Sequence, residues 1–334
     1  MTTLEKAPKL LSIQSHVVHG YVGNKAATFP LQVMGWDVNA LNTVNFSNHT
    51  GYGSFEGSVT SGDEIRQIYK GLKEIDVKYD AILTGYIHGA PTVKAVGEIC
   101  CEIKDTNPST FWLLDPVMGD EGQLYVKEDV IPEYRKILQS KLVDVITPNH
   151  FEVELLLGSK ITDKKSLLES VNRLHKEFAV KHVVISSLNL TECDLDVGGE
   201  ENENERIIAL VSSFNPLFDE KPNPPVLFKI NKIDSYFTGV GDLFSALLID
   251  RIYKKSYKNH VKHSSNILIE SANESLSVMS EVLSETTKIT SSRKSRVKGK
   301  IGSADTMKDC ELKIIECQSF YNNSNQKYNP IELM

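Results

Sequence analysis

The sequence predicts an α/β protein, a doubly wound three-layer α/β/α sandwich with a mostly parallel central sheet. Short apolar segments alternate with longer amphipathic segments from Leu10 to Ser187, which is the pattern of parallel strands joined by helices. Several short segments are apolar nearly throughout, as strands covered on both faces are. The residues directly after them are unusually polar, and ligands bind at the carboxyl ends of the strands in such sheets.

Six of the short segments are expected to be parallel strands. They are Leu10–Gln14, Val38–Thr43, Ala81–Thr84, Phe111–Leu114, Val143–Ile146 and His182–Ile185. Five segments between them have the length and apolar spacing of amphipathic helices. They are Gly23–Met34, Asp63–Leu72, Thr92–Lys104, Pro132–Gln139 and Lys164–Lys176. Helices of this length between strands predict crossover connections and hence a parallel sheet.

The composition changes in residues 191–225, which contain an acidic run and a proline-rich run and are expected to be a surface insertion. Two apolar segments, Ile207–Val211 and Val226–Ile230, are expected to add antiparallel strands at one sheet edge. Helices are expected at Leu243–Tyr253 and from Ser265 to Thr287. We expect residues 1–289 to form one domain and residues 290–334 to be a linker and a tail without an assigned role.

The composition excludes several classes of protein. The chain has 334 residues with 37 Lys and Arg against 44 Asp and Glu, a net charge of −7. Such a chain is a poor general binder of nucleic-acid phosphates or anionic membranes. The five cysteines form no C-x-x-C pair, so neither a disulfide framework nor a zinc site is indicated. Without an apolar segment of about 18 residues, the protein is expected to be cytoplasmic, with the nucleus as an alternative.

A glycine-rich turn before an apolar helix is the strongest single motif. Residues Gly239, Val240 and Gly241 are followed by Asp242 and then by an apolar run. The free N–H groups and the dipole of a helix N-terminus form an anion site that suits phosphate. Asp242 beside it could act as a general base, and the dipole would favour its ionised form. The alternative is a tight turn with an ordinary Asp at a helix start.

A second group of polar residues is acidic. Asp115 follows one predicted strand, Asp120 comes five residues later, and Asn149 precedes Glu152 by three residues. Carboxylate and amide oxygens at strand ends suit Mg²⁺ in a nucleotide site, and Asn149 and Glu152 could share one helix face. The alternative is that these are solvated loop residues.

Other catalytic motifs are absent from the sequence. It contains no G-x-x-x-x-G-K-[ST] motif and no G-x-G-x-x-G after the first predicted strand, so P-loop kinases and dinucleotide-binding enzymes are disfavoured. No pattern of paired histidines indicates zinc, and no Ser-His-Asp or Cys-His arrangement is supported. Cys100 and Cys101 fall in a predicted helix and are interpreted as packing residues.

Six blocks of sequence, in order, resemble the pyridoxal kinases of the ribokinase-like superfamily. The blocks are Leu11 to Asn24, Phe46 to Tyr52, Leu83 to Tyr86, Asp115 to Asp120, Ile146 to Glu152 and Gly239 to Asp242. The last block is shared across the superfamily, whereas the first two are more specific to pyridoxal kinases. The resemblance spans about Leu10 to Ile252 and implies a ribokinase-like kinase domain at residues 1–289.

The resemblance implies ATP-dependent phosphorylation of the 5′-hydroxymethyl group of pyridoxal, pyridoxine and pyridoxamine. Asp242 would be the base, and Gly239, Val240 and Gly241 the anion hole for the γ-phosphate. The vitamin pocket would contain Ser15, Val22, Phe46, Thr50 and Tyr86. The site for ATP and cations would contain Asp115, Asp120, Thr147, Asn149, Glu152 and Ser187, with Asp115 and Glu152 toward the metal. Members of the family use Mg²⁺ or another divalent cation together with a monovalent cation such as K⁺, and form homodimers.

Three other functions are considered. A hydroxymethylpyrimidine kinase of the same superfamily usually has a Gly-Gly-Ala-Gly type turn after the first strand, where this chain has Ser15 to Gly20. A catalytically idle relative that binds pyridoxal phosphate or a nucleotide would have no use for a base at Asp242. Sugar and nucleoside kinases are disfavoured because their early Gly-Gly segment and strand-built lid are not visible.

Overall fold

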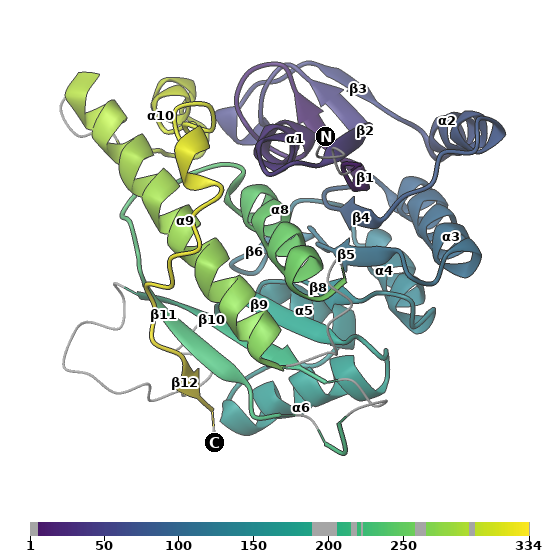
Figure 1. Ribbon diagram of the computed structural model, residues 1–334. Helices are drawn as coiled ribbons and strands as arrows, with labels where there is room; N and C mark the ends of the chain where they lie inside the picture. Colours follow the sequence, from purple (N-terminus) through teal and green to yellow (C-terminus); the bar gives the residue numbers. More distant parts are fainter. Residues whose placement is uncertain are drawn as a thin grey trace, which may run out of the picture.

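A ten-stranded sheet runs through the protein, with helices on both faces (Figure 1). The computed structural model describes residues 6–188, 206–214, 219–221, 223–257, 265–293 and 298–333. The strand order is β12-β11-β10-β9-β8-β5-β4-β1-β2-β3. The six strands from β9 to β2 in this order pair in parallel. The predicted fold class, a mostly parallel sheet covered on both sides, is confirmed.

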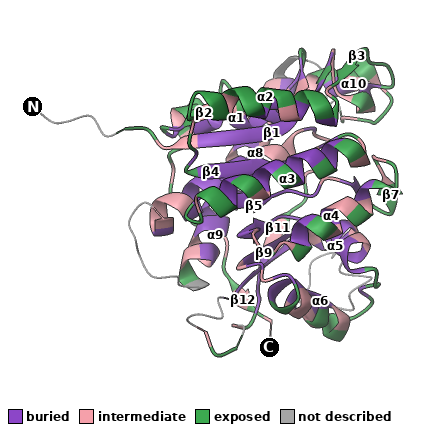
Figure 2. Ribbon diagram, turned by 90° about the vertical axis from the view of Figure 1, so that its right-hand side faces the viewer, coloured by how far each residue is buried: buried purple, intermediate pink, exposed green. Residues whose placement is uncertain are grey.

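All six predicted parallel strands are present. They are β1 (Lys9–Val17), β2 (Asp37–Phe46), β4 (Ala81–Thr84), β5 (Phe111–Leu114), β8 (Val145–Ile146) and β9 (His182–Leu188). The strands β4 and β5 have the predicted bounds and are buried along their whole length, as the purple strands of Figure 2 show. The first two strands extend three residues further than predicted at their carboxyl ends, to Val17 and Phe46, so they carry Ser15 and Phe46 within the sheet.

Each face of the sheet is covered by its own set of helices. One hydrophobic core lies beneath α2 (Gly62–Glu74), α3 (Ala90–Thr106), α4 (Val130–Gln139), α5 (His150–Leu157) and α6 (Lys164–Lys176). The other lies beneath α1 (Asn24–Val33), α8 (Val240–Ile252) and α9 (Ser265–Arg293). Capping boxes start α2 at Ser61 and α6 at Asp163, which explains why these predicted helices begin where they do.

Antiparallel strands extend both edges of the sheet. The predicted pair is confirmed as β10 (Arg206–Ser213) and β11 (Val226–Asn231), which pair antiparallel beside β9. The short strand β3 (Gly57–Val59) pairs with β2 at the opposite edge, and β6 (Gly119–Asp120) forms a separate hairpin with β7 (Gln123–Leu124). The acidic run of the predicted insertion lies outside the described residues. Among the described helices, none is long and apolar enough to cross a membrane.

The chain beyond residue 289 belongs to the same folded unit. The helix α9 continues through Thr290, whose hydroxyl donates to the Asp309 carbonyl over 2.6 Å, so the predicted linker does not begin there. Leu312, Ile314 and Tyr321 are fully buried in the core beneath α8 and α9. The remaining elements are α10 (Ala304–Asp309), the 3₁₀ turn η4 (Gln318–Phe320) and β12 (Ile331–Glu332), which pairs with β11.

The strand order places one switch point in the sheet between β1 and β4. The chain passes from β1 to its neighbour β2 through α1 on one face, and reaches β4 on the other side of β1 after α2 on the opposite face. Ligands bind outside the carboxyl ends of the strands at such a point. The loops that follow β1 and β4 are therefore the expected walls of a site.

Asp144, at the opposite end of the sheet, is expected to act on stability alone. It accepts hydrogen bonds from Lys104 Nζ and Lys181 Nζ, both over 2.6 Å, and from the Trp112 amide over 3.0 Å. Asp144→Ala leaves the buried Lys104 ammonium without this carboxylate and should lower the free energy of unfolding by about 3–5 kcal/mol.

Urea unfolding checks this prediction against Glu98→Ala, which breaks an exposed ion pair with Arg66 and should cost less than about 1 kcal/mol. Equal losses in the two variants would contradict it.

Candidate active site

The predicted glycine turn stands at the start of α8. Gly239 is the N-cap residue and has φ +77°, in the left-handed region that favours glycine. A Cβ atom on Gly239 would lie 2.0 Å from the Tyr21 carbonyl oxygen, so the turn packs directly on the loop after β1. The first N–H groups of α8 have no partner within the helix and point out of its N-terminus. The structure therefore has a helix N-terminus at the place where the sequence predicts an anion site.

Asp242 lies half-buried in the first turn of α8. Burial raises the pKa of its carboxyl, and a hydrogen bond from the Gly23 amide opposes this shift. The sequence predicts that the helix dipole favours the ionised form of Asp242. Burial outweighs the dipole, because loss of solvent disfavours the charge. A carboxyl group with a pKa moved toward neutrality is better suited to general base catalysis than an exposed one.

A buried carboxylate, Asp115, lies beside the glycine turn. Its Oδ2 would be 3.8 Å from a Cβ atom on Gly241, and it accepts a hydrogen bond from Ser245 Oγ over 3.1 Å. Ser245 is also 3.1 Å from Thr147 Oγ1. The pKa of Asp115 is held well above its usual range by burial and by the charges of Glu152 and Asp242. Ser245 was not predicted, although it follows Asp242 by three residues and so shares its helix face.

Glu152 and Asn149 form a capping box at the start of α5, which confirms that the two share one helix end. Glu152 accepts hydrogen bonds from the backbone N–H groups of Met118 over 2.8 Å and Asn149 over 2.9 Å, and Asn149 Nδ2 donates to the Gly119 carbonyl over 2.7 Å. The pair thereby fixes the backbone that leads into β6. Burial raises the pKa of Glu152 to about 7, and the hydrogen bonds from the backbone limit the shift.

The carboxylates suit a divalent cation that has further ligands of its own. Asp115 feels the charges of both Glu152 and Asp242, so a bound cation would relieve a repulsion that is present. Within the described part of the chain, no three His, Cys, Asp or Glu side chains converge closely enough to hold a metal ion by themselves. A cation here would complete its shell with water and phosphate oxygens, as Mg²⁺ does in nucleotide sites.

Four of the five predicted vitamin-pocket residues lie around the loop after β1. Val22 and Phe46 are buried in one small hydrophobic cluster, and Tyr86 packs against it. Ser15 lies beneath Gly23, since a Cβ atom on Gly23 would be 2.3 Å from Ser15 Oγ. The Gly23 amide, in turn, donates to Asp242. The role of Gly23 was missed because a backbone amide leaves no side-chain signal in the sequence.

Three predicted residues lie at the margins of this arrangement. Thr50 begins the 3₁₀ turn η1 (Thr50–Tyr52) and is exposed, and Ser187 is half-buried near the carboxyl end of β9. In the described portion of the protein, no hydrogen bond joins either residue to the other predicted site residues. Asp120 is exposed in β6, where its charge acts on Glu152, and its Oδ1 accepts a hydrogen bond from the Glu121 amide.

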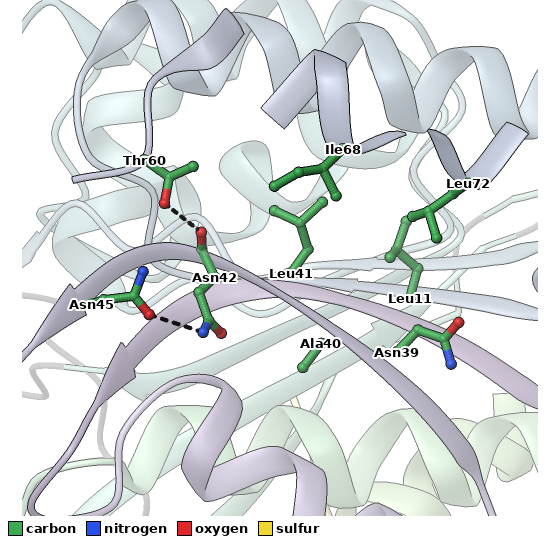
Figure 3. A pocket seen from close by; sticks show the side chains of 9 residues that line it. All are labelled: Leu11, Asn39, Ala40, Leu41, Asn42, Asn45, Thr60, Ile68 and Leu72. Atoms are coloured by element: carbon green, nitrogen blue, oxygen red, sulfur yellow. Dashed lines mark hydrogen bonds between the residues drawn. The ribbon is translucent and has the colours of Figure 1, made fainter. Parts of the chain in front are cut away.

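A groove of about 380 Å³ lies elsewhere, between β2 and α2 (Figure 3). Asn42 lines it and pairs with Asn45 and Thr60, and Leu41 and Ile68 form its apolar side. None of the predicted site residues lines this groove.

Comparison with known proteins shows the family. A family model described as phosphomethylpyrimidine kinase matches residues 38–285. A relative from Saccharomyces cerevisiae is 44% identical over 95% of this chain and 96% of its own. The pyridoxal kinase of Ovis aries is 40% identical over 85% of this chain and 87% of its own length. The chain belongs to the pyridoxal kinase family. The resemblance predicted from six sequence blocks is therefore confirmed.

The pyridoxal kinase fold extends over the whole described chain. The structure of the pyridoxal kinase of Leishmania donovani has a TM-score of 0.79 and 30% identity to this chain, covering 98% of it and 99% of the Leishmania chain. The tail beyond residue 290 is therefore inside the region that is similar to other pyridoxal kinases.

The contact between Gly239 and the Tyr21 carbonyl generates a prediction about activity. Gly239→Ala places a methyl group against a backbone oxygen, so the glycine turn must move, and kcat/KM should fall by about 10². Gly35→Ala is the matched control, because Gly35 also has a positive φ but has open space around it. It should lose about 1 kcal/mol of stability and keep its activity. A steady-state phosphorylation assay checks both variants, and equal activities would contradict the prediction.

The raised pKa of Glu152 generates a prediction about stability. Between its ordinary pKa of 4.5 and about 7, the unfolded chain releases the proton and the folded protein keeps it. The free energy of unfolding of the cation-free protein should therefore fall as the pH rises through this window, by at most about 3 kcal/mol for this group. Glu152→Gln should make the free energy of unfolding depend less on pH. Glu128→Gln, at an exposed carboxylate, should not change this dependence. Denaturant unfolding at pH 5 and pH 7 measures the change in the free energy of unfolding. The same change in Glu152→Gln as in the wild type would contradict the prediction.

Proposed function

We propose that this protein transfers the γ-phosphate of ATP to the 5′-hydroxymethyl group of pyridoxal, pyridoxine and pyridoxamine, with Asp242 as the general base. The observation that carries the proposal is the position of Gly23, whose amide lowers the pKa of Asp242 and whose Cα packs on Ser15. Gly23 thereby joins the glycine turn of Gly239 to Gly241, here called the anion turn, to the predicted vitamin pocket. The Leishmania donovani pyridoxal kinase was solved in complex with ADP and pyridoxine, and also with ADP and pyridoxamine.

Transfer requires one proton acceptor and a site for the charge on the phosphoryl group. In its ionised form Asp242 takes the proton of the hydroxymethyl group, whose oxygen forms a bond to the γ-phosphorus while the bond to the β-phosphate oxygen breaks and ADP leaves. The N–H groups of Gly239, Val240 and Gly241 would stabilise the oxygens of the transferred group. Val240 offers only its backbone N–H, where many family members have a threonine hydroxyl.

We place Mg²⁺, or another divalent cation, with ATP on the side of Asp115 and Glu152. Bound there, the cation would neutralise charge on the phosphate oxygens. The buried carboxylates and their mutual repulsion support this placement. Thr147, Asn149, Asp120 and Ser187 would line the nucleotide side, and K⁺ or a similar monovalent cation is proposed from the family resemblance.

A hydroxymethylpyrimidine kinase remains the second candidate, because the matching family model has a related description. That match begins at residue 38 and so leaves out β1 and the loop after it, where this chain has its Leu11 to Asn24 block. A catalytically idle binder is disfavoured, since it would not need a base beside an anion turn.

We also propose that the protein is a homodimer in the cytoplasm. The family resemblance supports the dimer, and the cysteine pattern, which fits a reducing compartment, supports the location. Light scattering after size-exclusion chromatography tests the dimer.

The general base is tested by Asp242→Asn. The amide keeps the shape of the carboxyl group but cannot take the proton, so kcat with pyridoxal and Mg-ATP should fall by about 10²–10⁴. Because the native carboxyl is held in a site that raises its pKa, the variant should be at least as stable as the wild type near pH 7. In the wild type, kcat/KM should rise with pH until Asp242 ionises, and this acid limb should disappear in the variant.

Absorbance of the phosphorylated aldehyde product measures the rate, and titration with ATP measures binding. Asp305→Asn, at an exposed carboxylate of the tail, is the control and should behave as the wild type. A rate within about twofold of the wild type in Asp242→Asn would remove Asp242 from the role of base. Turnover of a hydroxymethylpyrimidine but not of pyridoxal by the wild type would favour the second candidate.

A further inference from the structure

A buried carboxylate from the tail, Glu311, binds three segments of the candidate site. Its Oε2 accepts hydrogen bonds from the Tyr21 amide over 2.9 Å and from the Thr238 hydroxyl over 3.3 Å. Its Oε1 accepts one from the Tyr52 hydroxyl over 2.6 Å. Glu311 is 5% exposed and follows α10, in a part of the chain that has no role predicted from the sequence. The three donors come from the loop after β1, the turn η1 and the residue before the anion turn.

The loop after β1 is shaped to receive this carboxylate. Gly20 has φ +90°, and a Cβ atom on it would lie 2.4 Å from Glu311 Oε1. The next residue, Tyr21, donates its amide to Glu311 and presents its carbonyl to Gly239. Two residues further, the Gly23 amide donates to Asp242. Glu311 therefore holds the beginning of a short segment whose other atoms contact the anion turn and the proposed base.

Other contacts fasten the tail to the same two places. The Gly302 amide donates to the Gly51 carbonyl over 2.7 Å, next to Thr50. The Gly299 amide donates to Ser235 Oγ over 3.0 Å, and the Tyr236 amide donates to the Gly299 carbonyl over 3.3 Å, three residues before Gly239. Figure 2 shows α10 at the same end of the molecule as β3 and β7, which is the end toward which β1 runs.

We propose that Glu311 is a positioning residue. It sets the distance between the loop after β1 (residues 18–23), here called the vitamin loop, and the anion turn, so that the acceptor hydroxyl, Asp242 and the γ-phosphate align. The proposal rests on the proposed function, since it assigns a positioning role in that reaction. Glu311 does not touch the reacting groups: it acts through Tyr21, Tyr52 and Thr238.

A carboxylate is suited to this position because all three partners are donors. An ionised carboxylate has two oxygens and accepts several hydrogen bonds without offering a competing donor. Burial, together with Glu311, raises the pKa of the Tyr52 phenol, so Tyr52 remains protonated and donates. Alanine would leave the Tyr21 amide and the Tyr52 hydroxyl without their acceptor in a buried place. Glutamine could serve two of the donors, while the Tyr52 hydroxyl turns to accept from its amide.

The kinetic test compares Glu311→Ala and Glu311→Gln with the wild type. In Glu311→Ala, kcat/KM for pyridoxal should fall by about 10², because small displacements of reacting groups have effects of this size. KM for ATP should stay within about twofold, since Asp115, Thr147 and Glu152 are held by other contacts. Glu311→Gln should recover at least about a tenth of the wild-type kcat/KM. Glu316→Gln, at an exposed carboxylate of the same segment, is the matched control and should equal the wild type.

Hydrogen exchange supplies a readout that does not require turnover. In Glu311→Ala, peptides covering residues 18–24, 49–53 and 234–241 should exchange faster, while β4 and β5 should exchange as in the wild type. Even acceleration over the whole chain, or kcat/KM within about twofold of the wild type in folded Glu311→Ala, would overturn the proposal. Absence of pyridoxal phosphorylation by the wild type would instead reject the proposed function, and the kinetic role of Glu311 with it, whereas the exchange pattern would still show whether Glu311 holds the loops.

Tyr52→Phe tests the contact if Glu311→Ala does not fold. It removes one hydroxyl and leaves the ring in place, and it should lower kcat/KM by about three- to tenfold. In Glu311→Gln the second substitution should have a smaller effect than in the wild type, because the hydrogen bond between the two side chains then joins neutral groups and is weaker than one to a carboxylate. Strict additivity of the two changes would overturn the proposal.

Discussion

The candidate site depends on the contact between two glycine turns that the fold brings together. Gly239 packs on the Tyr21 carbonyl at a distance that excludes any side chain, and Gly23 packs equally closely on Ser15 while its amide binds Asp242. Both turns have positive φ. Because backbone atoms of one loop contact backbone atoms of the other, the anion turn and the vitamin loop cannot come closer than this contact, and the hydrogen bonds to Glu311 hold them at it. Such rigidity is what phosphoryl transfer requires, since catalysis there consists mostly of positioning.

The buried carboxylates of the same site lower the stability of the folded state. Asp115, Glu152 and Asp242 all have raised pKa values for which burial is the leading cause, and Asp115 also feels the other two charges. Three such groups oppose folding at neutral pH when no cation is present. The buried network of backbone amides around Glu152 offsets part of this cost, because it supplies hydrogen bonds to the charged form. The proposed role of the site, to bind ATP with a divalent cation, would account for carboxylates in places where a stable core would have apolar residues.

The sequence predicted the parts of the structure that have a recognisable pattern of neighbouring residues. The six central strands and five of the helices follow from apolar periodicity, and Gly239 to Asp242 from a motif with a physical meaning. The pairing of β10 with β11 was also predicted, from two apolar runs. The linker was predicted to begin at Thr290 because the residues from there to Lys300 are rich in Ser, Lys and Arg, whereas α9 continues to Arg293. The burial of the tail was not predicted, because it depends on Leu312, Ile314 and Tyr321, which have no regular spacing. Ser245 and Gly23 could be found only when the distances were known, since each acts through a partner distant in the sequence.

The hydrogen-bond partners of Glu311 lie far from it along the chain, unlike the contacts that build the sheet. The parallel sheet is built from strand–helix–strand units whose contacts are mostly between neighbours in the sequence. The hydrogen bond from the Tyr21 amide to Glu311, in contrast, joins residues 290 positions apart, and that from the Tyr52 hydroxyl spans 259. Closing so long a loop is entropically unfavourable until the rest of the core has formed. Because β12 is part of the sheet and Leu312, Ile314 and Tyr321 are buried in the core, the tail contributes to the fold as well as to the shape of the loops that Glu311 joins.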